Sequence, residues 1–141
     1  MKCIDLLNFK QIPENLITSL SEVEKSENIF KLKAYSYYRQ FLVNENLNDW
    51  LKTIFDFKFH ASYQVIRNGI SIHKDFNRNE CFNYLINSGG KNVVTNFYDD
   101  NNILIDSMNI PEKIWHRLDV SKFHGIDNIE NIRYSVSVTK I

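Results

Sequence analysis

Apolar and polar residues repeat with two different periods along this chain of 141 residues, and the change between them falls near residue 60. In two earlier stretches, apolar residues stand three or four positions apart, which is typical of amphipathic helices. The apolar positions of these stretches are Leu16, Ile17, Leu20 and Val23, then Leu47, Trp50, Leu51, Ile54 and Phe55. We expect both helices to pack against the outside of a β-sheet.

Local signals predict where these helices begin. Pro13 suits the first turn of the first helix, where a missing N–H breaks no hydrogen bond. Asn46 is the expected N-cap of the second helix, because a short polar side chain can accept a hydrogen bond from the first turn. Between the helices, a pattern typical of an edge strand appears, in which Phe30, Leu32 and Ala34 alternate with lysines.

From residue 61 onward, short runs with a period of two indicate β-strands, and turn-forming residues separate the runs. The predicted strands cover residues 62–67, 70–73, 81–87, 92–98, 103–107, 113–118, 121–126 and 132–140. That many strands are typical of a double-stranded β-helix, or jelly roll, in which two sheets face each other. We therefore expect one mainly β (α+β) domain over residues 1–141, with helical support in 1–60 and a jelly-roll core in 61–141.

The composition excludes several classes of protein. The formal net charge is zero and no basic stripe is present, so the sequence gives no strong nucleic-acid signal. No apolar run is long enough to span a bilayer, and the N-terminus lacks the features of a signal peptide. We expect a cytoplasmic protein whose Cys3 and Cys81 are reduced thiols, because their spacing suits no metal site.

The strand predicted over residues 70–73 leads into the first chemically distinctive pair. Alternation places His73 and Asp75 on one face, two residues apart. An imidazole and a carboxylate so placed are two of the three ligands of a facial triad, which holds Fe(II) and leaves other coordination positions open. The pair alone is a weak signal. His124, near the C-terminus, is the expected third ligand.

The last predicted strand carries an expected anion site. Turn-forming residues between His124 and Arg133 suit a hairpin, and Arg133, Ser135 and Ser137 then share one strand face. A guanidinium binds a carboxylate bidentately, and a neighbouring hydroxyl adds a further hydrogen bond. We interpret Arg133 and Ser135 as a carboxylate receptor near the metal, as 2-oxoglutarate requires when its other end chelates iron.

These residues together resemble a known family. The order His73-x-Asp75, His124 and Arg133-x-Ser135 is similar to that of the 2-oxoglutarate- and Fe(II)-dependent oxygenases, most closely the prolyl-4-hydroxylase-like branch. The resemblance covers residues 63–141. It implies a dioxygenase whose cofactors are Fe(II) and 2-oxoglutarate and which hydroxylates a C–H bond with dioxygen.

A further stretch matches that branch, with Gly89-Gly90, Thr95 and Phe97 after the run Cys81-Phe82-Asn83-Tyr84-Leu85-Ile86-Asn87. In the family, the tyrosine of this run bonds the distal carboxylate of 2-oxoglutarate, so the resemblance implies that role for Tyr84. Asn83 should face the opposite way if the strand is regular. The inserted Ile86 and the short core differ from the family. This difference bears on the substrate class that the resemblance implies more than on the cofactor chemistry.

Several alternatives stay open. The substrate is a protein or peptide side chain or a small metabolite. The fold also suits a cupin-like metal-binding jelly roll without 2-oxoglutarate chemistry, or a barrel that serves only as an interaction module. Arg78 is expected to contact substrate, to orient Asp75 or to lie in solvent, and His116 to be structural, to be exposed or to contact substrate.

Overall fold

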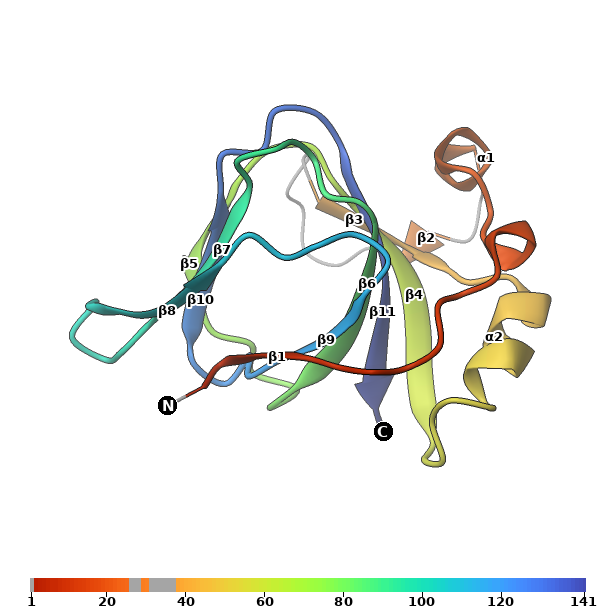
Figure 1. Cartoon of the computed structure of the whole chain (residues 1–141), viewed down its shortest axis with the longest axis horizontal. Helices are drawn as coiled ribbons and strands as arrows, with labels where there is room; N and C mark the ends of the chain where they lie inside the picture. The colour runs from red at the N-terminus through yellow and green to blue at the C-terminus, as the bar shows by residue number, and fades with distance from the viewer. Residues whose placement is uncertain (1, 26–28, 31–37) are drawn as a thin grey trace.

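The computed structural model describes residues 2–25, 29–30 and 38–141 (Figure 1). The strands of these residues form two antiparallel sheets. The larger sheet has the order β1 (Ile4–Leu6), β9 (Trp115–Leu118), β6 (Cys81–Asn87), β11 (Arg133–Lys140), β4 (Phe59–Ile66), β3 (Tyr38–Leu42) and β2 (Ile29–Phe30). The smaller sheet has the order β5 (Ile70–His73), β10 (Phe123–Asp127), β7 (Val94–Tyr98) and β8 (Leu104–Met108).

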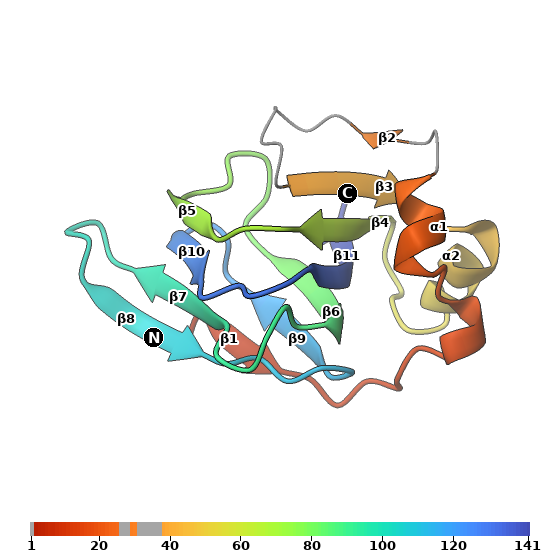
Figure 2. The same ribbon diagram turned by 90° about the horizontal axis from the view of Figure 1, so that it is seen from above.

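The sheets face each other across a barrel interior, and the helical segments lie on the outer side of the larger sheet (Figures 1 and 2). These segments are a 3₁₀ turn (Glu14–Leu16), α1 (Leu20–Glu24) and α2 (Glu45–Leu51). The fold is a mainly β two-sheet jelly roll with two short helices outside it, which confirms the predicted fold class. Among the described residues, no helix has the length and apolarity needed to span a bilayer.

The two faces of β11 show how the sequence pattern builds this arrangement. Tyr134, Val136 and Val138 are buried on the outer face, in one apolar cluster with Leu47 and Leu51 of α2. Full burial of such a side chain stabilises the fold by about 1.5–3 kcal/mol. The alternate residues of β11 are the polar ones, and the period of two turns them toward the barrel interior. The outer core is therefore apolar, while the inner face of the same strand stays polar.

Both helices begin at positions other than the predicted ones. Pro13 precedes only the 3₁₀ turn, and α1 begins after Ser19, whose hydroxyl accepts a hydrogen bond from Glu22 N. The N-cap of α2 is Asn44 rather than Asn46. The Asn44 amide donates to the carbonyl of Leu16 instead of capping α2, so tertiary contacts take the side chain that a local signal would use.

Two strands of the larger sheet were absent from the prediction. β1 pairs with β9, and β3 pairs with β4. Of the predicted edge strand, Phe30 lies in β2, whereas Leu32 and Ala34 lie outside the described residues.

A glycine sets the close approach of β5 and β10. A Cβ atom on Gly125 would lie 2.7 Å from the carbonyl oxygen of Ile70, closer than real Cβ contacts. Only a residue without a side chain fits there. This contact holds the two strands at the separation that places His73 opposite His124.

Candidate metal centre

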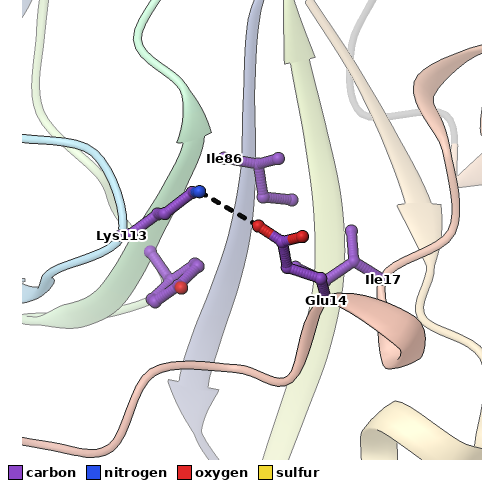
Figure 3. A pocket seen from close by; sticks show the side chains of 5 residues that line it. Glu14, Ile17, Ile86 and Lys113 are labelled. Carbon is purple, nitrogen blue, oxygen red and sulfur yellow. Dashed lines mark hydrogen bonds and ion pairs between the residues drawn. The ribbon is translucent and has the colours of Figure 1, made fainter.

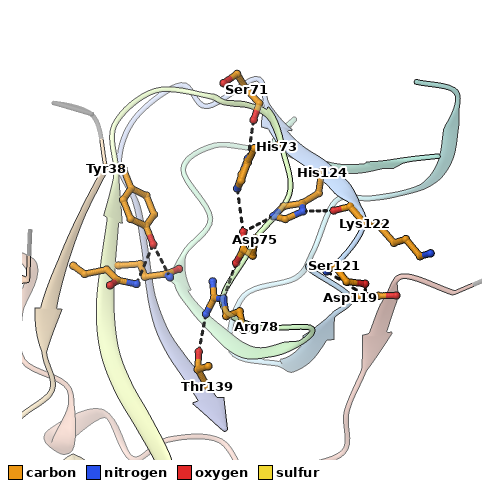
Figure 4. A network of polar contacts seen from close by, with 12 residues as sticks. Tyr38, Ser71, His73, Asp75, Arg78, Asp119, Ser121, Lys122, His124 and Thr139 are labelled. Atoms are coloured by element: carbon orange, nitrogen blue, oxygen red, sulfur yellow. Dashed lines mark hydrogen bonds and ion pairs between the residues drawn. The ribbon is translucent and has the colours of Figure 1, made fainter. Parts of the chain in front are cut away.

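Three side chains converge at one end of the barrel interior (Figure 4). His73 ends β5 and His124 lies on β10, and the two residues pair directly across the sheet with ring centroids 4.3 Å apart. Asp75 follows β5, and its backbone N–H donates to the carbonyl of Val120 at 3.1 Å. Fold and register therefore bring together the three predicted ligands, which lie far apart in the sequence.

The ligand atoms of the three residues lie within 4.8 Å of one another. Asp75 Oδ1 is 3.3 Å from His73 Nε2 and 3.5 Å from His124 Nε2. Each imidazole directs Nδ1 at a backbone carbonyl, that of Ser71 at 2.8 Å and that of Lys122 at 2.7 Å. When Nδ1 donates to a carbonyl, the neutral ring keeps a lone pair on Nε2, which a metal can use.

The charges at the site suit a cation. Burial raises the pKa of Asp75, but hydrogen bonds from His73 and Arg78 and the charge of Arg78 outweigh it and bring this pKa down to about 2. The hydrogen bond with Asp75 raises the pKa of His73, whereas burial lowers that of His124. Phe97, fully buried, stacks on His124 with centroids 5.3 Å apart, so the inner wall behind this ligand is apolar.

Arg133 lies on the polar inner face of β11 and is 4% exposed. Its Nη2 atom is 3.4 Å from the hydroxyl of Thr95 on β7. Within the described residues, no carboxylate lies within ion-pair distance of this guanidinium. Burial lowers the pKa of Arg133 to about 10, so the side chain remains charged at neutral pH. Ser135, the other predicted receptor residue on β11, is also buried on this face.

Tyr84 does not lie with these residues, which corrects the expected role. It pairs with Val136, on the helix-covered side of the larger sheet, and its ring packs on Trp115 with centroids 5.3 Å apart. Burial raises the pKa of the Tyr84 hydroxyl, and the backbone of Ile12 opposes this rise. Alternation along β6 sends the neighbouring Asn83 to the inner face instead.

Tyr84 borders a pocket of about 190 Å³ on that outer side (Figure 3). The other lining residues are Glu14, Ile17, Ile86 and Lys113. An ion pair of 3.0 Å between Lys113 and Glu14 crosses the pocket mouth. The larger sheet separates this pocket from the triad.

Asn83 forms a polar row inside the barrel with Ser137 of β11 and His116 of β9, its direct partners in register. Asn83 Oδ1 and Ser137 Oγ are buried and have no hydrogen-bond partner among the described residues. Burial and the charge of Arg133 lower the pKa of His116 to about 3, so this ring is neutral. The row offers hydrogen-bonding atoms to whatever occupies the interior.

Two residues near the triad were not predicted from the sequence. The Tyr38 hydroxyl accepts hydrogen bonds from Gln40 at 3.0 Å and Gln64 at 2.9 Å, and burial raises the pKa of Tyr38 to about 12. Thr139 bonds Arg78 near the end of β11. Alternation along β11 would have placed Thr139 on the polar face. Its hydrogen bond with Arg78, however, depends on the conformation of the loop that carries Arg78, which no sequence pattern encodes.

No protein-family model matches the chain, and no curated protein matches it. Solved structures do share its arrangement of strands. Oxalate decarboxylase from Bacillus subtilis superposes with a TM-score of 0.53 at 12% identity, over 84% of this chain and 28% of that one. Procruciferin, an 11S globulin from Brassica napus, superposes with a TM-score of 0.53 at 8% identity over the same shares. The fold is a cupin-type jelly roll.

Another structure of the Bacillus subtilis cupin enzyme, matched at a TM-score of 0.52 and 11% identity, concerns its Mn(II) centres. This chain spans little more than a quarter of the length of the proteins it matches. At such identities the likeness establishes the cupin-type fold alone, and the chemistry depends on the residues of this chain.

Proposed function

We propose that this protein is a mononuclear metal-dependent dioxygenase that uses Fe(II) and 2-oxoglutarate. The observation that carries the proposal is the buried Arg133, a cation on the inner face of the barrel that also holds the triad. A metal-binding barrel alone has no need of such a cation. A dicarboxylate that chelates the metal at one end requires an anion receptor for its other end.

The donor set fits a divalent transition metal. His73 and His124 would supply neutral imidazole nitrogens and Asp75 a carboxylate oxygen, the set typical of non-haem Fe(II) oxygenases. The carbonyls that accept from both Nδ1 atoms orient the rings. With three protein ligands, further coordination positions remain for a chelating acid and for dioxygen.

The charge of Arg133 fits a carboxylate. A buried cation without a partner is costly, and a carboxylate would supply both the opposite charge and hydrogen-bond acceptors. The hydroxyl of Thr95 lies beside this cation, and Ser135 is buried on the same face of β11. Unpaired polar atoms of Asn83 and Ser137 face the same interior. These groups suit a polar, chain-like ligand in the barrel.

The protein residues would bind and orient the reactants. Arg133 and Ser135 would hold the distal carboxylate, and the three ligands would hold the metal. With dioxygen, Fe(II) and 2-oxoglutarate supply oxidative decarboxylation to succinate and carbon dioxide, coupled to oxidation of a substrate C–H bond. The buried ring of Phe97 would provide an apolar wall beside His124. The substrate would be a protein or peptide side chain or a small metabolite.

A second candidate follows from the similarity to oxalate decarboxylase. In a cupin-like enzyme without 2-oxoglutarate chemistry, Arg133 would bind a carboxylate of the substrate itself. The analogy rests on the shared fold, and the acid that binds decides whether it holds. The two candidates share the triad and the cation but differ in the acid that binds.

Ligand-dependent unfolding separates them. We expect 2-oxoglutarate to raise the melting temperature of the protein in the presence of Mn(II), and succinate to raise it less because it lacks the 2-oxo chelate. At 100 times its Kd, a ligand of the native state adds about 2.7 kcal/mol to the free energy of unfolding. Oxalate in place of 2-oxoglutarate tests the second candidate, and His124→Ala is the control without a complete triad.

Turnover completes the test. Aerobic protein with Fe(II) should convert 2-oxoglutarate to succinate, even slowly and without substrate. The proposal fails if 2-oxoglutarate neither stabilises the metal-loaded protein nor yields succinate. Stabilisation by oxalate alone would instead support the second candidate.

A further inference from the structure

The two carboxylate oxygens of Asp75 face different neighbours. Its Oδ1 atom faces Nε2 of His73 and of His124, at 3.3 and 3.5 Å. Its Oδ2 atom accepts a hydrogen bond from Arg78 Nε at 2.6 Å. A cation that reaches both imidazoles therefore meets Oδ1, while the second oxygen is already engaged.

Arg78 is itself fixed on its far side. Its Nη1 atom donates to Thr139 Oγ1 at 2.7 Å, and only 22% of the side chain is exposed. Thr139 lies on β11, the strand that also carries Arg133 and Ser135. Figure 4 shows the resulting chain of contacts, which runs from the triad through Arg78 to β11.

We propose that Arg78 is a positioning residue for the metal, which restricts Asp75 to one ligating oxygen and ties this ligand to β11. The inference rests on the metal site proposed above. Bidentate coordination by Asp75 would require the contact between Arg78 and Oδ2 to break. The restriction leaves more coordination positions for exogenous ligands, and the link to β11 fixes the triad relative to the strand of the anion receptor.

Two effects of Arg78 on a bound cation oppose each other. Its hydrogen bond orients the carboxylate, which favours binding, whereas its positive charge repels the metal. Arg78→Lys keeps the charge but replaces the planar fork with a single ammonium, which cannot bond Asp75 and Thr139 in the same way. This variant therefore tests orientation without removing repulsion. Thr139→Val preserves shape and charge and removes only the anchor of Arg78.

Arg117 offers a matched control outside the site. Its Nε atom bonds Glu80 at 2.5 Å and its Nη1 atom bonds Asp5 at 3.2 Å, so it also bridges two side chains. The Arg117 side chain is 31% exposed. Arg117→Lys disturbs a comparable ion-pair bridge whose carboxylates are not metal ligands.

The experiment is a Mn(II) titration of the full chain, in which EPR measures free Mn(II). Removal of outer-shell partners commonly costs about 10–100-fold in metal affinity. We expect a loss of at least about 10-fold in Arg78→Lys, a smaller loss in Thr139→Val and a change within about twofold in Arg117→Lys. Circular dichroism checks that each variant is folded.

A second readout reports on the coordination itself. Visible absorption of bound Co(II) depends on coordination number, so Arg78→Met, which releases Oδ2 of Asp75, should shift the bands relative to wild type. Affinity within about twofold of wild type in Arg78→Lys, together with unchanged Co(II) bands in Arg78→Met, would overturn the positioning role. Unchanged affinity in Thr139→Val alone would overturn the link to β11. Wild type that binds no Mn(II) would instead refute the metal site.

Discussion

Replacement of Arg133 by methionine tests whether the fold maintains a buried cation for a ligand. Burial lowers the pKa of Arg133 from 12.5 to about 10. That difference corresponds to about 3 kcal/mol of unfavourable free energy for the charged form in the folded state. Among the described residues, Thr95 supplies the one hydrogen bond to this side chain, which is long at 3.4 Å and offsets at most about 1 kcal/mol of this penalty.

We expect Arg133→Met to be more stable than wild type by about 1–3 kcal/mol in the absence of ligand, because apolar replacements of buried charges often stabilise proteins in this range. Urea denaturation measures the difference. With Mn(II) and 2-oxoglutarate at 100 times its Kd, wild type should gain about 2.7 kcal/mol and the variant little, so the advantage of the variant should be cancelled or reversed.

Arg117→Met is the control for loss of an arginine. Its partly exposed ion pairs with Glu80 and Asp5 should contribute about 0–1 kcal/mol, so this variant should be slightly less stable than wild type. If Arg133→Met is also destabilised, by more than about 1 kcal/mol without ligand, then Arg133 serves the fold itself. The assignment of an anion receptor would then be refuted.

Other predictions address the remaining residues. Metal content should be near one per chain by atomic spectroscopy and fall sharply in Asp75→Ala; equal content would contradict the triad. Tyr84→Phe should leave 2-oxoglutarate affinity unchanged by calorimetry, because the Tyr84 ring packs on Trp115 in the outer core and does not face the metal centre. Asp75 raises the pKa of His73 in the folded, metal-free protein. This pair therefore stabilises the fold below about pH 6.5, and the stabilisation is lost as the pH rises through the folded pKa of His73. The urea midpoint of Asp75→Asn should lack this pH dependence. Gly125→Ala should cost about 1–3 kcal/mol and weaken Mn(II) binding, as its Cβ would separate β5 from β10; unchanged binding would show that this contact does not set the site.

The sequence predicted the jelly roll because most strands of its core have a buried face and a regular period. β11 is the clearest case, since polar and apolar residues alternate from Arg133 to Val138. β1, with only three residues from Ile4 to Leu6, is too short for a period to stand out. β3 joins the sheet through pairing with β4, a tertiary contact that short-range patterns do not report.

Residue types and spacing also predicted the three convergent ligands, whereas the role of Tyr84 depended on which way one strand faces. Alternation requires Asn83 and Tyr84 to point in opposite directions, but it does not say which of them faces the interior. The register with β11 decides this, and it shifts between Tyr134 and Ser135, so that Ser135 pairs with Leu85 and Val136 with Tyr84. Since Val136 belongs to the helix-covered core, Tyr84 must lie there too. A ligand carboxylate at Arg133 therefore has to find its other hydrogen bonds on the inner face.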